Sequence, residues 1–241
     1  MVSNPLTDNF TNGVFWEAYE DLERQFQQFL DYVPYDGNEK TYSYRLLNLI
    51  SSIGGHVDSA FKEMARFPKF STNPDCQEIL KKVSDSQKQM KAGKPPIPVS
   101  IKLCLKAFET EYGISSKTVT FKRLPKREPL VPYKPFNQST NAPEWWEIYN
   151  GLKHDLGTNI RDANLKNTRD ALSGAFLLNA IHQPAILRLY DYDVIKFPAL
   201  VRGERKEGSM TFPRQQLEYC LDKKKGFDGY LETPLFIFTY G

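Results

Sequence analysis

The sequence predicts a mainly α-helical protein with a small β element near its C-terminal end. Apolar residues recur at three- and four-residue steps over 14–32, 41–67 and 163–181, which is the spacing of one face of an α-helix. From residue 187 the pattern changes to short apolar runs separated by proline and glycine, which is typical of strands and turns. A chain of 241 residues is long enough to bury one sizeable core.

The first two helices are predicted by their apolar stripes and by the turn between them. The helix over 14–32 ends at a cluster of turn residues, 33–38. The helix over 41–67 contains Gly54 and Gly55 near its middle, where each glycine costs on the order of 1 kcal/mol of helix propensity. This cost predicts either a kink or the close approach of another helix.

The middle of the chain is predicted to hold shorter elements. Helical spacing over 74–91 and 100–112 indicates two helices, of which the first is mostly polar and is expected at the periphery. Alternation over 117–124 predicts a short strand. A long loop with three prolines then leads to a short helix after Pro143, and the most apolar helix, 163–181, is expected at the centre of the bundle.

The C-terminal part is predicted to be β-rich. Short strands are expected at 190–196, 199–202, 209–212 and 235–240. We divide the chain into a helical domain over 12–184, with a loop-rich insertion at about 68–142, and a small β-containing extension over 185–241.

Composition is that of an ordinary soluble globular protein, with 40% hydrophobic and 25% charged residues. A net charge of +3 is too weak to require nucleic acid as a partner and does not exclude it. No apolar run approaches the roughly 20 residues of a membrane span, and residues 1–9 carry no secretory pattern. We therefore expect a cytoplasmic protein with no membrane association.

The cysteines and histidines argue against a metal site. Cys76, Cys104 and Cys220 are far apart, no C-x-x-C spacing occurs, and the chain has only three histidines. We expect reduced thiols, no metal and no cofactor.

The candidate site lies in the short helix at about 144–155, which contains two adjacent tryptophans. At 100° per residue, Asn150 and His154 form one stripe together with Trp146. The nearly opposite side carries the apolar residues Trp145, Ile148, Leu152 and Leu156. The apolar side is expected to dock on the bundle, so that Asn150 and His154 point toward a cleft or a partner subunit.

Asn150 and His154 have the functional groups that metal-free phosphodiester chemistry needs. An imidazole exchanges protons near neutral pH, an amide orients a phosphate, and Lys153 supplies positive charge. The alternative is a histidine that is simply solvated or hydrogen-bonded on a polar helix face.

A longer pattern resembles the HEPN superfamily (higher eukaryotes and prokaryotes nucleotide-binding domain). It consists of Trp145-Trp146-x-x-Tyr149-Asn150-x-x-Lys153-His154-Asp155, then Ala163-Asn164-Leu165-Lys166-Asn167, with His56-Val57-Asp58-x-x-x-Lys62 on the paired helix. The motif of that family is an arginine, a polar residue, three variable residues and a histidine. Asn150 stands at the polar position, His154 at the histidine position, and Tyr149 where the family has arginine. The resemblance covers about 40–67 and 143–182.

The resemblance implies an antiparallel helical bundle, a homodimer in which two motifs meet, and metal-independent endoribonuclease activity of a toxin or defence type. RNA or a nucleotide is then the substrate, and an antitoxin is a further partner that this class implies. His154 and Asn150 would be catalytic, and Lys153, Tyr149, Arg161 and Asp58 would contact substrate or support it. Lys153 or Arg161 would replace the arginine fork that clamps phosphate. Asp58 and Lys62 are spaced i, i+4 and are expected to pair on the helix surface; the alternative is that the Asp58 carboxylate holds the ring of His154. Other members are inactive, so a non-catalytic nucleotide-binding, RNA-binding or protein-interaction module stays open.

Overall fold

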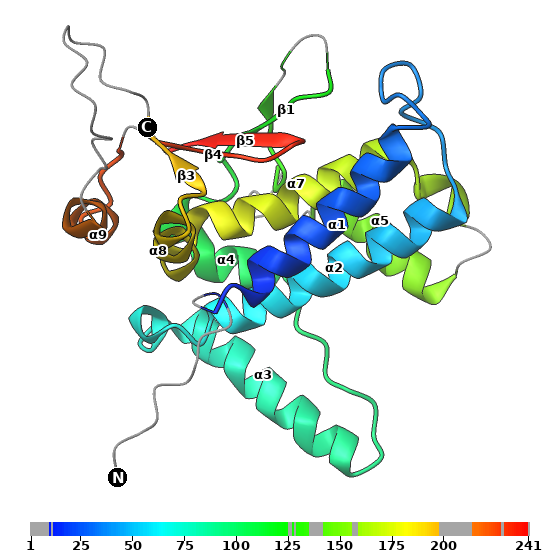
Figure 1. Ribbon diagram of the computed structural model, residues 1–241. Coiled ribbons are helices and arrows are strands. Elements are labelled where there is room, and N and C mark those ends of the chain that lie inside the picture. The colour runs from blue at the N-terminus through cyan, green and yellow to red at the C-terminus, as the bar shows by residue number, and fades with distance from the viewer. Residues whose placement is uncertain are drawn as a thin grey trace, which may run out of the picture.

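The computed structural model describes residues 10, 12–124, 127, 129–134, 142–155, 159–197, 214–227 and 229–240. Over these ranges the protein is mainly helical with one small antiparallel sheet, which confirms the predicted fold class at that level (Figure 1). The helices are α1 (Val14–Leu30), α2 (Tyr44–Met64), α3 (Pro74–Lys91), α4 (Ile101–Tyr112), α5 (Glu144–His154), α7 (Leu165–Ile181), α8 (Gln183–Asp191) and α9 (Arg214–Asp222). The strands are β1 (Val119–Phe121), β2 (Pro129–Leu130), β3 (Ile195–Lys196), β4 (Tyr230–Glu232) and β5 (Phe236–Thr239).

The core lies between α1, α2, α5 and α7, which pack side by side (Figure 1). Almost every side chain of α7 is buried, because α1, α2 and α5 contact it around its circumference. The prediction that this helix is central is therefore confirmed. Its N-cap is Asn164, whose side chain accepts a hydrogen bond from the backbone N–H of Asn167 at 3.0 Å.

Two helices from the insertion form a lateral unit. α4 packs against α2 and α3, while α3 extends away from the bundle (Figure 1). Only Cys76, Ile79 and Ser86 of α3 are buried, in agreement with its predicted peripheral place.

The sheet joins strands from two distant parts of the sequence. Its order is β2-β1-β5-β4-β3, and every neighbouring pair is antiparallel. Strands β1 and β2 come from the insertion, and the other three come from the C-terminal part. The sheet packs on α7, where the rings of Phe176 and Phe236 stack with centroids 5.6 Å apart. The insertion and the C-terminal extension therefore share one β structure.

The region after α7 differs from the prediction at 190–196. Only Ile195 and Lys196 form a strand, because residues up to Asp191 belong to α8. Pro184 does not prevent this helix, since it lies in the first turn, where its missing N–H has no helical partner to lose. The strands predicted at 199–202 and 209–212 lie outside the described residues. Helix α9 and strand β4 were not predicted.

A buried carboxylate links the bundle to the sheet. Glu23 of α1 is 3% exposed and accepts hydrogen bonds from the hydroxyl of Thr233 and, at 3.0 Å, from the backbone N–H of Leu235. Burial raises the pKa of Glu23, and these two hydrogen bonds oppose that shift because they favour the charged form. The turn between β4 and β5 is thus held on α1 by polar contacts.

Candidate functional site

Helix α5 presents a broad buried face to the bundle. Trp145, Trp146, Tyr149 and Leu152 are buried, and the indole N–H of Trp145 donates to the carbonyl of Pro132 at 2.8 Å. Packing against both α2 and α7 makes this face wider than a single apolar stripe. The prediction that Trp145 is a core residue is confirmed. Trp146, which shares the stripe of Asn150 and His154 by its spacing, is buried as a packing residue too.

Tyr149 fills the space above a glycine of the neighbouring helix. It is 3% exposed, and a Cβ atom added to Gly54 of α2 would lie within 3.0 Å of its ring. The predicted close approach at the glycine pair is therefore confirmed, with α5 as the approaching helix. The ammonium of Lys153 lies 3.9 Å from the centroid of the same ring, which is a cation–π contact. Tyr149 is thus enclosed by packing in this structure.

The outward side of α5 carries the predicted chemistry. Asn150 is half-buried, and Lys153 and His154 are exposed in the last turn of the helix. The carbonyl end of a helix carries partial negative charge, which favours the cationic side chains found there. The side-chain amide of Asn159 donates to the carbonyls of Gly151 at 3.2 Å and Asp155 at 2.8 Å. This amide holds the C-terminal end of α5 in place.

Arg161 lies at the same end of the bundle as His154. It belongs to a short 3-10 turn, Ile160–Asp162, and its side chain is exposed. This turn follows Asn159 directly, so the hydrogen bonds from Asn159 to α5 keep the turn beside the helix end. The structure therefore brings Arg161 and the last turn of α5 into one region.

Asp58 is engaged on its own helix. Its carboxylate forms an ion pair with Lys62, one turn further along α2, as its spacing predicts. Its charge also contributes to raising the pKa of Cys104 in α4, which places the carboxylate on the side of α2 that faces α4. We therefore leave Asp58 out of the chemistry proposed below.

Of the other two histidines, His182 is buried in the core and His56 is half-buried. Burial lowers the pKa of His56 to about 4 and that of His182 to about 3, so both are neutral at physiological pH. The Nδ1 atom of His182 is 3.0 Å from the hydroxyl of Tyr112, and its ring packs edge-on against Phe10 and Phe67. His154 is therefore the exposed histidine of the described chain.

One neighbouring segment was not predicted as part of the site. The connection between α1 and α2 packs on the start of α7. There the backbone carbonyl of Thr41 accepts a hydrogen bond from the N–H of Leu165, and the backbone carbonyl of Glu39 accepts one from the N–H of Lys166, both at 3.0 Å. Tyr42 also pairs with Asn164 in an isolated β-bridge. The closely spaced tyrosines 42 and 44 were the sequence signal available for this segment.

Within the described ranges, no group of three or more His, Cys, Asp or Glu side chains is arranged to hold a metal ion, and no helix there is long and apolar enough to cross a membrane. The three cysteines are free and buried. Comparison of the chain with protein-family models, with curated proteins and with solved structures gives no match. The functional argument therefore rests on the residues and their geometry.

Proposed function

We propose that this protein is a metal-independent endoribonuclease of the HEPN type, active as a homodimer. The observation that carries the proposal is the outward side of α5, where His154 and Lys153 are exposed and Asn150 is accessible one turn earlier. Arg161 adds a second cation at the same helix end. An imidazole, an amide and two cations in one place match the needs of phosphodiester cleavage by proton transfer.

In the proposed reaction, the RNA 2′-oxygen attacks the adjacent phosphorus while the bond from phosphorus to the 5′-oxygen breaks. One imidazole accepts the proton of the 2′-hydroxyl, and an imidazolium gives a proton to the departing 5′-oxygen. The products are a 2′,3′-cyclic phosphate and a 5′-hydroxyl. One chain supplies a single exposed imidazole in the described ranges, so we assign the two proton transfers to His154 and to His154 of the partner subunit.

The phosphate contact is assigned to Lys153, with Arg161 beside it. Tyr149 stands where the family motif has arginine, and its ring is buried against Gly54. The exposed Lys153 ammonium lies over that ring, so it places a positive charge on the solvent side of Tyr149. A lysine supplies charge without the two-pronged geometry of a guanidinium. The amide of Asn150, one turn before His154, orients the phosphate oxygens.

Tyr149 also favours a second function. Its use as a packing residue removes the arginine fork of the family motif, and a protein without that fork retains an RNA-binding surface but loses transition-state stabilisation. The second candidate is therefore a non-catalytic RNA-binding module that uses Lys153 and Arg161. For both candidates, a toxin or defence role with an antitoxin as partner is tested by measuring the growth of cells that express the protein.

Cleavage of single-stranded RNA in the presence of EDTA tests the first proposal. General acid–base groups contribute roughly 100- to 10,000-fold to a rate, so His154→Ala should lower cleavage by at least about 100-fold. Loss of the charged contact in Lys153→Ala should cost roughly 10- to 100-fold, and Lys153→Arg should restore most of it. Lys91→Ala, at the exposed end of α3, is the matched control and should cleave like wild type.

Equal cleavage by wild type and His154→Ala would refute the catalytic proposal. Binding of RNA that depends on Lys153, without cleavage, would establish the second candidate instead. Sedimentation of the wild-type protein across a concentration range tests the homodimer. Because the proposed mechanism needs His154 from both chains, adding His154→Ala protein to wild type should lower cleavage as the subunits exchange, since mixed dimers hold only one His154 imidazole.

A further inference from the structure

The last turn of α5, which carries Lys153 and His154, has little support from its own sequence. It begins at Gly151, and glycine is a poor helix former. Leu152 is buried, whereas Lys153 and His154 after it are exposed. Asp155, which follows the helix, is extended, with φ −148° and ψ 93°, so it is not the left-handed residue with which many helices end. An exposed helix end of this kind frays unless other groups hold its carbonyls.

The side chain of Asn159 holds this turn. Its amide nitrogen donates to the backbone carbonyls of Gly151 at 3.2 Å and Asp155 at 2.8 Å. An amide nitrogen carries two N–H groups, so both bonds form at once and neither N–H is left for a ligand. One acceptor lies three residues before His154, and the other lies one residue after it. The amide thus spans the backbone that carries His154.

The amide of Asn159 also packs on α5 at Gly151. A Cβ atom built at Gly151 would lie 3.4 Å from Nδ2, 3.5 Å from Cγ and 3.9 Å from Oδ1 of Asn159, and these are its three nearest atoms. Such distances are ordinary contacts, so an alanine fits at this position beside the amide. The helix propensity of the turn can therefore be raised at Gly151 without displacing Asn159.

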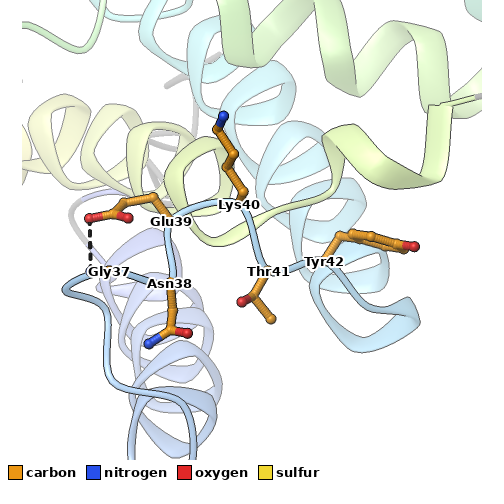
Figure 2. A pocket seen from close by; sticks show the side chains of 6 residues that line it. All are labelled: Gly37, Asn38, Glu39, Lys40, Thr41 and Tyr42. Atoms are coloured by element: carbon orange, nitrogen blue, oxygen red, sulfur yellow. Dashed lines mark hydrogen bonds between the residues drawn. The ribbon is translucent and has the colours of Figure 1, made fainter.

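The turn after Asn159 is fixed independently of α5. The amide of Asn167 in α7, a residue that is 5% exposed, donates to the carbonyl of Asp162 at 2.8 Å. The start of α7 is bonded in turn to the connection between α1 and α2, which Figure 2 shows at the hollow of about 620 Å³ that Gly37 to Tyr42 line. Asn159 therefore joins the exposed end of α5 to a framework that other hydrogen bonds hold in place.

We propose that Asn159 is a positioning residue for the proposed cleavage reaction, acting on His154 through the two carbonyls that it binds. This inference rests on the proposed function, in which the imidazole has to stay within hydrogen-bond reach of an RNA oxygen. A misplacement of about 1 Å can cost on the order of 100-fold in rate. Asn159 is half-buried, and its amide N–H groups are used within the protein. Its effect is therefore on the geometry of the helix end and not on the RNA itself.

Cleavage of single-stranded RNA by Asn159→Ala protein tests this role. The rate should fall by roughly 10- to 100-fold, and Asn159→Leu, which keeps the branched shape of the side chain without its donors, should lose as much. Adding Gly151→Ala to Asn159→Ala should recover part of the loss, because alanine favours the helix in this turn. Asn73→Ala is the matched control, since the side chain of Asn73 caps α3 and its amide donates to the carbonyl of Ala107 at 3.1 Å. This control should lower the stability of the protein and leave cleavage unchanged.

Amide hydrogen exchange, followed by NMR, gives a readout that does not depend on cleavage. The N–H of Asp155 donates to the carbonyl of Gly151 at 2.9 Å and closes the last turn of α5. In Asn159→Ala, the N–H groups of Lys153, His154 and Asp155 should exchange roughly 5- to 10-fold faster relative to the rest of α5, because opening of the turn no longer breaks the bonds of the amide. Adding Gly151→Ala should slow this exchange again.

Equal cleavage by wild type and Asn159→Ala would overturn this inference and leave the proposed function intact. A loss of cleavage with unchanged exchange would indicate a direct contact with RNA and would also overturn it. If the wild-type protein cleaves no RNA, the proposed function fails, and the exchange measurement still decides whether Asn159 orders the helix end. Faster exchange in Asn159→Ala would then support its positioning of His154, and unchanged exchange would refute it.

Discussion

The two adjacent glycines of α2 should respond in opposite directions to the same substitution. A Cβ atom at Gly54 would lie within 3.0 Å of the ring of Tyr149, whereas one at Gly55 would meet nothing within 4 Å. Both residues lie in the interior of the helix, so each alanine gains on the order of 1 kcal/mol of helix propensity. Gly55→Ala should therefore raise the free energy of unfolding by about 0.4–1 kcal/mol.

Gly54→Ala should lower the free energy of unfolding despite the same gain in propensity. The atoms that the new methyl meets include Cγ of Tyr149, which is the base of the side chain and not a flexible end. The ring is also confined by Trp146, 5.0 Å away between centroids, and by the Lys153 ammonium. Overpacking of this kind typically costs about 1–3 kcal/mol, and more when backbone has to move. After the propensity gain is subtracted, a net loss of up to about 2 kcal/mol is expected, and more where backbone has to move.

Urea denaturation followed by circular dichroism measures both variants, and a double-mutant cycle identifies the cause. Tyr149→Ala alone should cost roughly 3–5 kcal/mol, as for other large aromatic side chains in a core. In that background the methyl of Gly54→Ala enters free space and should no longer destabilise the protein. If Gly54→Ala stabilises the wild-type protein as much as Gly55→Ala does, the contact between α2 and α5 is not as described here.

Three further predictions follow from buried groups. Glu23→Ala should lower the free energy of unfolding by about 1–3 kcal/mol and speed hydrogen exchange in β4 and β5. The reason is that the hydroxyl of Thr233 and the N–H of Leu235 lose the carboxylate that accepts their hydrogen bonds. The control Glu20→Ala, at an exposed position of α1, should change neither quantity. The pKa values of His182 (about 3) and His56 (about 4) lie below that of an unfolded histidine, about 6.5, so the unfolded chain takes up protons first. The stability that the two neutral imidazoles contribute should be complete above pH ~6.5. Below that pH, the free energy of unfolding should decrease by up to ~1.4 kcal/mol per pH unit for each imidazole. His182→Phe should make this decrease less steep in urea titrations, and an unchanged slope would contradict the assignment. Burial raises the pKa of Cys104 to about 12, so a thiol reagent at pH 8 should modify it only after unfolding, and rapid labelling of native protein would contradict its buried place.

The helices were predictable because their signal is local. The buried residues of α1 and α2 recur every three or four positions, and this period is visible without knowledge of the neighbours. Strands of two to four residues give no such period, and one of the two partners of β5 in this sheet is β1, more than one hundred residues earlier. The placement of α8 was missed for another reason. Pro184 lies in the first turn of α8, and the local sequence does not distinguish a proline that begins a helix from one that follows a helix end.

The candidate site was predictable only in part. The one-turn spacing of Asn150 and His154 follows from helix geometry alone, and both remain accessible in the structure. How much of α5 is buried depends on two neighbours, α2 and α7, and the helix spacing alone does not give this width. The place of Arg161 depends on the hydrogen bonds of Asn159, and that of Tyr42 on a β-bridge to Asn164. Contacts of this kind leave no pattern in the sequence.

A tyrosine at position 149 has a physical reason in the helix opposite. Gly54 leaves a flat recess, and an aromatic ring fills it with apolar contact and no polar group that needs a partner there. An arginine side chain at Tyr149 would place a guanidinium in a position that is 3% exposed, where an unpaired charge is costly. The glycine and the ring therefore fit one another, and an arginine at position 149 would require a change at Gly54 as well. A positive charge beside Tyr149 is supplied instead by the Lys153 ammonium, which lies over the face of the ring. Cleavage by wild type and by His154→Ala separates the proposed nuclease from a protein that only binds RNA, and the cleavage rate of Lys153→Ala then measures what this cation contributes.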